Sequence, residues 1–260
     1  MWKVFKYTVY DLLRSKWTFA YALFYFALTV FLFAFSSSIT KVVVGLMNTI
    51  LLLAPLVSTF FTVSYYYNSK DFVLFLLAQP LKRTDIIRGM LLGLTASLGI
   101  AVLVGIGMPF AYMSLTQGSS IASYAFLLVI GVILSSVFSF IVYWIALRFD
   151  DKLKGIGVSL LVWLFFAVIY DAIFLLLLIY LRDYPIEKLA IALTLLNPID
   201  LSRVFILLQL DISALFGLTG ASVKAFLGST TGSIATFVAL LLWMLLSYIG
   251  ITVMAKKKDF

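Results

Sequence analysis

Few side chains of this chain have the types and spacing needed for chemistry. The 260 residues include no histidine and no cysteine, which excludes imidazole acid–base catalysis and thiolate metal sites. Asp171 is the acidic residue placed well inside a long apolar run. A carboxylate at the centre of a membrane costs roughly 2.5 to 3.5 kcal/mol, so it needs a partner or water. We expect Asp171 either to pair with Arg203 or Arg182, or to act with Asn48 and Arg203 in a substrate path or gate.

Metal and nucleotide chemistry have little support in the remaining residues. The seven methionines could bind Cu(I) through their thioethers, with Met108 and Met113 as candidates, but ordinary packing is the simpler explanation. No segment matches GxxxxGK[ST], and the glycine-rich residues 228–232 lack the required lysine. We predict no catalytic residue, no metal site and no directly bound cofactor.

The composition indicates that these residues lie in a membrane. Hydrophobic residues make up 64% of the chain and charged residues only 12%, and the mean hydropathy is +1.15. About 20 apolar residues in a helix cross a hydrocarbon core of roughly 30 Å, and isolated strands cannot satisfy their backbone in lipid. The sequence therefore predicts an all-α polytopic protein with six spans, at residues 17–35, 42–66, 86–114, 121–147, 156–181 and 233–254.

The basic residues predict the orientation. Fourteen of the 19 lysines and arginines fall on the face that holds both termini, and basic residues concentrate on the cytosolic side. We expect both termini in the cytosol, including a tail at residues 255–260. The net charge of +8 needs no nucleic-acid partner, because no soluble basic domain is present.

Residues 1–16 are predicted to form an interfacial helix. Apolar and charged side chains separate onto two faces, as in helices that lie along a membrane surface. A simple basic flank that orients the first span is the compatible alternative. The predicted faces are Trp2, Phe5, Val9, Leu12 and Leu13 on one side and Lys3, Lys6, Tyr10 and Arg14 on the other.

Residues 69–80 form a short apolar helix candidate between the second and third spans. Ser69 is placed to cap it, Asp71 favours its positive end, and Pro80 cannot continue it. The segment is too short to cross a membrane and too apolar for water. It should therefore be buried against lipid headgroups, the bundle or a partner protein.

A stripe of small residues runs along the third span at intervals of four. Such stripes let helix backbones approach closely in lipid, although the sequence leaves open whether the partner lies within the chain or across a dimer. A shorter version in the fourth span comprises Gly131, Ser135 and Ser139. The members in the third span are Gly89, Gly93, Ser97, Ala101 and Gly105.

Residues 182–232 are predicted to be a structured outer segment. Asn197 and Pro198 form a helix start, with Asp200 in the first turn, so a helix should run towards Gln209. Residues 212–226 are expected to lie on or dip into the membrane. Four glycines should prevent a seventh span: Gly217, Gly220, Gly228 and Gly232.

The order of these parts resembles the permease subunits of ABC-2 type transporters. The passage FVLFLLAQPLKRTDIIRGMLLG is similar to the family stretch after the second span, although Met90 stands where the family usually has lysine. VIYDAIFLLL and NPIDLSR resemble pieces of the members that serve nitrous oxide reductase maturation. The matching positions in the first passage are Gln79, Pro80, Leu81, Arg83, Ile86, Gly89 and Gly93.

The resemblance implies a homodimer in the bacterial inner membrane that binds cytosolic ABC ATPase subunits, which carry ATP and Mg. It also implies a periplasmic partner protein on the outer segment, and transport of a copper- or sulfur-related species. The residues implied to contact the ATPase are Asp71, Phe72, Phe75, Leu76, Leu77, Pro80 and Arg83.

Three alternatives remain open. The chain could be an ABC-2 permease for a lipid, a drug, a polysaccharide or gliding motility, or a scaffold that transports nothing. An intramembrane enzyme is disfavoured, because the chain lacks a second buried acid and a GxSxG serine as well as histidine and cysteine.

Overall fold

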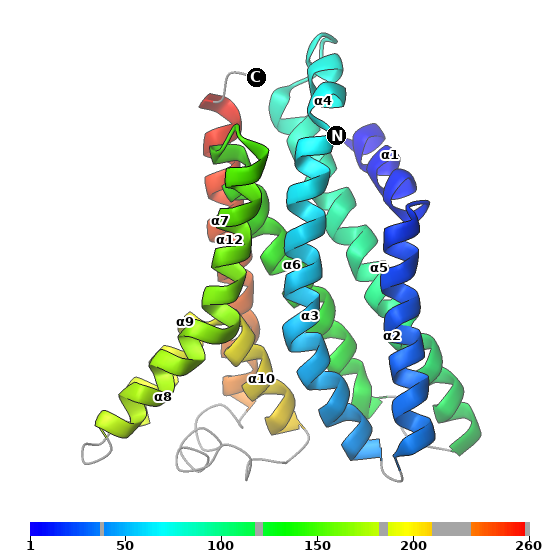
Figure 1. The fold of residues 1–260 in the computed structure, drawn as a ribbon, viewed down its shortest axis with the longest axis vertical. Coiled ribbons are helices and arrows are strands. Elements are labelled where there is room, and N and C mark those ends of the chain that lie inside the picture. Colours follow the sequence, from blue (N-terminus) through cyan, green and yellow to red (C-terminus); the bar gives the residue numbers. More distant parts are fainter. Residues whose placement is uncertain (37–38, 118–121, 182–186, 210–229, 258–260) are drawn as a thin grey trace.

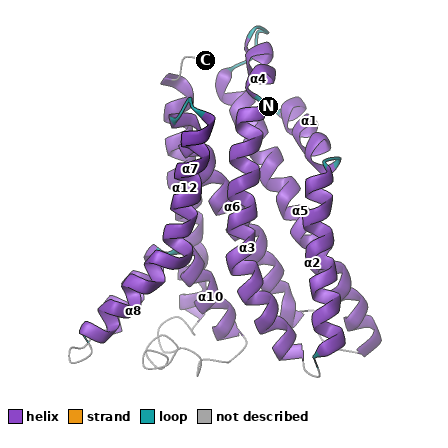
Figure 2. Ribbon diagram, in the orientation of Figure 1, coloured by secondary structure: helices purple, strands orange, loops and turns teal. Residues whose placement is uncertain are grey.

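The computed structural model describes all residues except 37–38, 118–121, 182–186, 210–229 and 258–260. Every regular element in the described part is a helix (Figure 2). In chain order the helices are α1 (Trp2–Leu13), α2 (Lys16–Phe35), α3 (Ile39–Asn68), α4 (Lys70–Leu77), α5 (Arg83–Gln117), α6 (Ala122–Arg148), α7 (Lys152–Leu164), the π-helical turn η1 (Phe165–Ile169), α8 (Tyr170–Tyr180), α9 (Glu187–Leu196), α10 (Pro198–Gln209) and α12 (Thr230–Lys257).

Among the described residues, six helices are long and apolar enough to cross a membrane. They are α2, α3, α5, α6, the continuous α7–η1–α8 helix and α12, so the all-α fold with six candidate spans is confirmed. Helices α9 and α10 together are apolar enough for a further span but bend by 113° between them, as in a broken span or a re-entrant loop.

One predicted boundary is wrong. Gly232 was expected to interrupt the chain before the last span, but α12 already begins at Thr230. The first amide groups of a helix have no partner within it, so glycine there weakens the helix less than glycine in the interior. The other three glycines and residues 212–226 lie outside the described residues.

The two ends of the bundle differ in what they carry (Figure 1). Helices α1 and α4 lie at one end together with the last turn of α12, and we call this the α4 end. Helices α8 and α10 lie at the other, which we call the α10 end. The first and last helices therefore place both ends of the chain on the same side, as an even number of spans requires.

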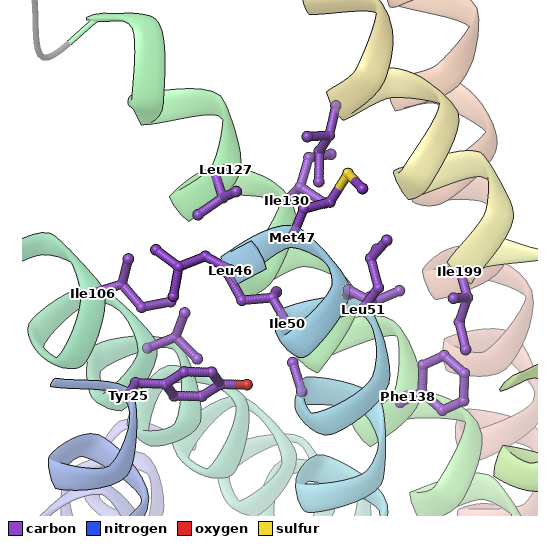
Figure 3. Packing of buried hydrophobic residues seen from close by; sticks show 14 of the residues in the cluster. Tyr25, Leu46, Met47, Ile50, Leu51, Ile106, Leu127, Ile130, Phe138 and Ile199 are labelled. Carbon is purple, nitrogen blue, oxygen red and sulfur yellow. The ribbon is translucent and has the colours of Figure 1, made fainter. Parts of the chain in front are cut away.

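The core lies where α3, α5 and α6 meet. Figure 3 shows Leu46 and Ile50 of α3 facing Ile106 of α5 and Ile130 of α6, and Tyr25 of α2 joins them. All five side chains have no exposed surface. This packing makes α3, α5 and α6 the fixed frame of the molecule.

The fifth span differs from the unbroken helix predicted at residues 156–181. It begins earlier, at Lys152, because Asp151 caps it by accepting a hydrogen bond from the Leu153 amide (2.8 Å). The five residues of η1 then form a π-helical turn in its middle, and no residue of η1 or α8 is buried. A π turn widens the helix and displaces its hydrogen bonds, and α8 leads away from the bundle (Figure 1).

Candidate functional site

Helix α4 presents the first candidate site. It runs from Lys70 to Leu77, with Asp71 in its first turn, and ends before Pro80, which has no amide proton to continue it. Ser69 occupies the N-cap position but its side chain makes no capping hydrogen bond. The prediction that Ser69 caps the helix through its hydroxyl is therefore wrong, because its ψ of 7° is not the extended backbone that capping requires.

The inner face of α4 packs against the bundle. Val73 and Leu76 are buried in a small apolar cluster with Val4 of α1 and with Ile86 and Met90 of α5. At the edge of this cluster Phe72 is half-buried, and its ring stacks on Tyr7 of α1 at 4.7 Å between centroids. A displacement of α4 must therefore move α1 and the start of α5 with it.

The outer face of α4 leaves apolar side chains uncovered. Phe75 is 64% exposed, and Leu74 is 47% exposed. Leu81, in the turn that follows, is 42% exposed. We call the exposed residues Asp71, Leu74, Phe75, Pro80 and Leu81 the α4 surface.

Helix α1 packs closely against α5 and so supports the inner face of α4. A Cβ added at Gly93 would lie 2.7 Å from the Thr8 Cβ, and one at Gly89 would lie 2.9 Å from the Val4 Cβ. Only glycine allows this approach, since real Cβ atoms do not come so close. At Gly105, the third glycine of the stripe, an added Cβ would lie 2.6 Å from the Ala22 carbonyl oxygen of α2.

The small-residue stripe therefore faces helices of the same chain. Ser97 and Ala101 are buried in this row, and the Ser97 hydroxyl donates to the Gly93 carbonyl at 2.8 Å. On α1 the residues that face the protein are Val4, Thr8 and Leu12. Trp2 and Leu13, from the apolar face predicted for this helix, remain exposed.

A polar cluster at the α10 end forms the second candidate site. Arg203 of α10 binds two carboxylates, Asp171 of α8 and Asp200 of its own helix, each at 3.0 Å from its Nη1. The ion pair between Arg203 and Asp171 joins the fifth span to the outer segment. Arg203 was one of the two partners considered for Asp171; the other, Arg182, lies outside the described residues.

Asn197 connects the same two elements through a second set of bonds. Its Oδ1 accepts a hydrogen bond from the Ile199 amide at 3.0 Å and so caps α10. Its Nδ2 donates to Asp200 at 2.8 Å and to the carbonyl of Phe166, inside η1, at 2.9 Å. A π turn leaves carbonyls without their usual helical partner, so Asn197 satisfies one of them.

A cavity of about 210 Å³ adjoins this cluster, and Asn48 of α3 and Arg203 both line it. The structure thus brings the predicted residues Asn48 and Arg203 to one cavity and connects Asp171 to it through Arg203. In the described part of the chain, no group of three metal-binding side chains comes together. The cluster thus places a cation with two carboxylate partners beside a cavity that a residue of α3 also lines.

Comparison with known proteins gives a distant relationship. No protein-family model matches the chain. The probable ABC transporter permease protein NosY of Pseudomonas aeruginosa is 27% identical over 220 residues, which cover 78% of this chain and 80% of that protein. The protein of the same name from Stutzerimonas stutzeri is 26% identical over the same shares. The chain is a distant homologue of ABC transporter permeases.

As an ABC permease homologue with six candidate spans, the chain is a multi-pass membrane protein. Permeases of this kind are the membrane subunits of their transporters, and ATPase activity is not theirs. The alignment covers most of the chain and therefore includes both the α4–α5 region and the polar cluster. It does not single out either region.

For this permease homologue, the residues predicted to contact the ATPase do not all face the same way. Asp71, Phe75, Pro80 and Arg83 are exposed. Leu76 faces the bundle, and Phe72 and Leu77 are partly covered. Leu74 and Leu81 are also exposed, although the prediction did not name them. Helical spacing gave a signal for Leu74: Val73 and Leu76 are three apart and share one face, which places Leu74 and Phe75 on the other.

Proposed function

We propose that this chain couples ATP hydrolysis by separate cytosolic ATPase subunits to movement of a solute across the bacterial inner membrane. The observation that supports the proposal is the α4 surface. Leu74, Phe75 and Leu81 are apolar, exposed and held on a helix whose other face is packed. Apolar anchors on a rigid support are typical of residues that contribute most to a protein interface.

The proposed mechanism begins with the ATPase moving α4. Val73 and Leu76 transfer the displacement to α1 and to the start of α5, and the glycine contacts of α5 carry it to α1 and α2. ATP biases the equilibrium only if it binds the ATPases more tightly in one arrangement of the membrane subunits than in the other. At the α10 end, the bonds of Arg203 and Asn197 to the fifth span would break and re-form as the subunit changes its arrangement.

The transporter is proposed to contain two copies of this chain. The fifth span offers a surface for the second copy, because no residue of η1 or α8 is buried within the monomer. A periplasmic partner protein is proposed to bind near α9 and α10, at the end opposite α4. Both termini are accordingly placed in the cytosol.

For the transported species we propose a copper- or sulfur-related group used in nitrous oxide reductase maturation. The support is the distant similarity of 78% of the chain to proteins named NosY. Without histidine or cysteine, a bare copper ion would have only methionine, carboxylate and backbone ligands, so a sulfur-containing species is favoured. Asp171, Asn48 and Arg203 are proposed to line its path or to control the gate.

The experiment replaces Leu74 and Phe75 with aspartate, singly and together, and measures copurification of the ATPase with the full-length chain. Each charge should abolish copurification while membrane insertion is unchanged. Leu196→Asp is the control, because Leu196 is similarly exposed (58%) but belongs to α9 and not to the α4 surface. Normal copurification with the Leu74→Asp, Phe75→Asp double variant would refute the proposed coupling.

A further inference from the structure

Arg88 of α5 carries a positive charge that the protein itself does not neutralise. Its guanidinium lies over the ring of Tyr248 of α12, with 5.5 Å between Cζ and the ring centroid. Its Nε is buried without a hydrogen-bond partner. Among the described residues, none of the ion pairs of the chain involves Arg88. A guanidinium has five donor hydrogens and is always charged, so this side chain has unused capacity for an anion.

Tyr248 is also one end of an apolar groove. The groove has a volume of about 400 Å³ and is lined by Phe140 of α6 and by residues of α12 from Val238 to Tyr248. Leu241 and Leu245, near its middle, are 56% and 51% exposed. Arg88 therefore lies next to one end of this apolar groove on the surface of the bundle.

The dimensions of the groove suit a lipid chain. Val238 and Tyr248 are ten residues apart on α12, which corresponds to about 15 Å along a helix. This is half the thickness of a hydrocarbon core of roughly 30 Å, the depth that one acyl chain occupies. The groove is thus about as long as one acyl chain, and Arg88 lies at its end nearest α4.

We propose that Arg88 and this groove form a binding site for one anionic phospholipid in the leaflet at the α4 end. The phosphate accepts hydrogen bonds from the Arg88 guanidinium, and an acyl chain lies along Leu241 and Leu245. Charge complementarity favours this occupant over an uncharged lipid, because a cation between spans attracts anionic headgroups. Exposed basic residues at the same end, including Lys256, add to the attraction. The proposal depends only on the chain spanning a membrane.

The test is native mass spectrometry of the full-length chain with phosphatidylglycerol and with phosphatidylcholine of the same acyl chains. We expect the unmodified chain to retain phosphatidylglycerol in preference. Arg88→Gln should weaken phosphatidylglycerol binding about tenfold, a change of roughly 1.4 kcal/mol, and leave phosphatidylcholine unchanged. Leu245→Trp, which fills the groove, should weaken the binding of both lipids.

Two controls separate this site from general effects. Arg14→Gln removes the exposed arginine that follows α1, a helix at the same end but on the other side of the bundle (Figure 1), and should not change lipid retention. Arg88→Lys keeps the charge and should retain most of the binding. The proposal is overturned if Arg88→Gln binds phosphatidylglycerol like the unmodified chain, if Arg14→Gln weakens it equally, or if Arg88→Lys loses as much as Arg88→Gln. Conversion of a dimer to a monomer by Leu245→Trp without lipid loss would instead assign the groove to a second copy.

Discussion

The α4 end and the α10 end are held together by different physics. At the α4 end, helices meet through buried apolar side chains and through glycines that bring α1 against α5. At the α10 end, Leu201 and Phe205 of α10 are also buried in the apolar core, but the contacts from Arg203 and Asn197 to the fifth span are polar. Apolar contact between close backbones has no alternative partner in water, whereas polar groups can exchange partners with water or a ligand. The comparison indicates a stiff α4 end that receives a displacement, and an α10 end where the polar bonds to the fifth span can exchange while α10 stays packed in the core.

A substitution that disrupts the packing at the stiff α4 end should have the largest effect on stability and on ATPase binding. Gly93→Leu places a side chain where the Thr8 Cβ lies 2.7 Å away, so α1 must move off α5. Overpacking of this kind costs about 1–3 kcal/mol, and we expect a lower thermal midpoint and weaker ATPase copurification, measured on detergent-purified protein.

Gly157→Leu is the matched control for this change. A Cβ at Gly157 would meet no atom within 4 Å, so the larger side chain has open space. Equal losses in the two variants would show that leucine in a span, and not the contact with α1, is responsible.

Removing Asn197 should give an intermediate effect. Asn197→Ala deletes the cap of α10 and the donor to the Phe166 carbonyl, and loss of a helix cap costs about 0.5–2 kcal/mol. We expect faster hydrogen exchange in α10 and η1 while α4 is unchanged, as measured by mass spectrometry.

Asn68→Ala serves for comparison, because the Asn68 side chain accepts only an exposed hydrogen bond from Lys152. Faster exchange that spreads to α1 and α4 in Asn197→Ala would contradict the independence of the two ends.

Asp171→Asn should give the smallest change in stability. Its side chain is 29% exposed and that of Arg203 is 37% exposed, and Arg203 keeps Asp200 as a partner. Partly exposed ion pairs contribute up to about 1 kcal/mol, so we expect a thermal midpoint close to that of the unmodified chain but reduced transport. If Asp171→Asn changed neither assembly nor transport, the pair would have no role in the gate.

The sequence predicted those features that depend on local patterns. Long apolar runs gave the six spans, and Asn197 with Pro198 gave the start of α10, because both follow from residues close together in the chain. The resemblance and the basic flank drew attention to α4. These features need no knowledge of what packs against them.

Features that depend on distant partners were missed. The π turn at Phe165–Ile169 is accompanied by the Asn197 side chain, 31 residues from Phe166, and no local pattern marks it. Leu76 and Phe75 are equally apolar, and only the packing of α1 and α5 decides which one faces inward. The partner of the small-residue stripe was likewise open until α1 and α2 were seen against it.

The central claim is that Phe75 lies in the cytosol and is covered by the ATPase. The chain has no cysteine, so Phe75→Cys gives a single thiol that a membrane-impermeant maleimide can label. In inside-out vesicles we predict labelling when the ATPase is absent and protection when it is bound. Labelling from the periplasmic side, or equal labelling with and without the ATPase, would contradict the account.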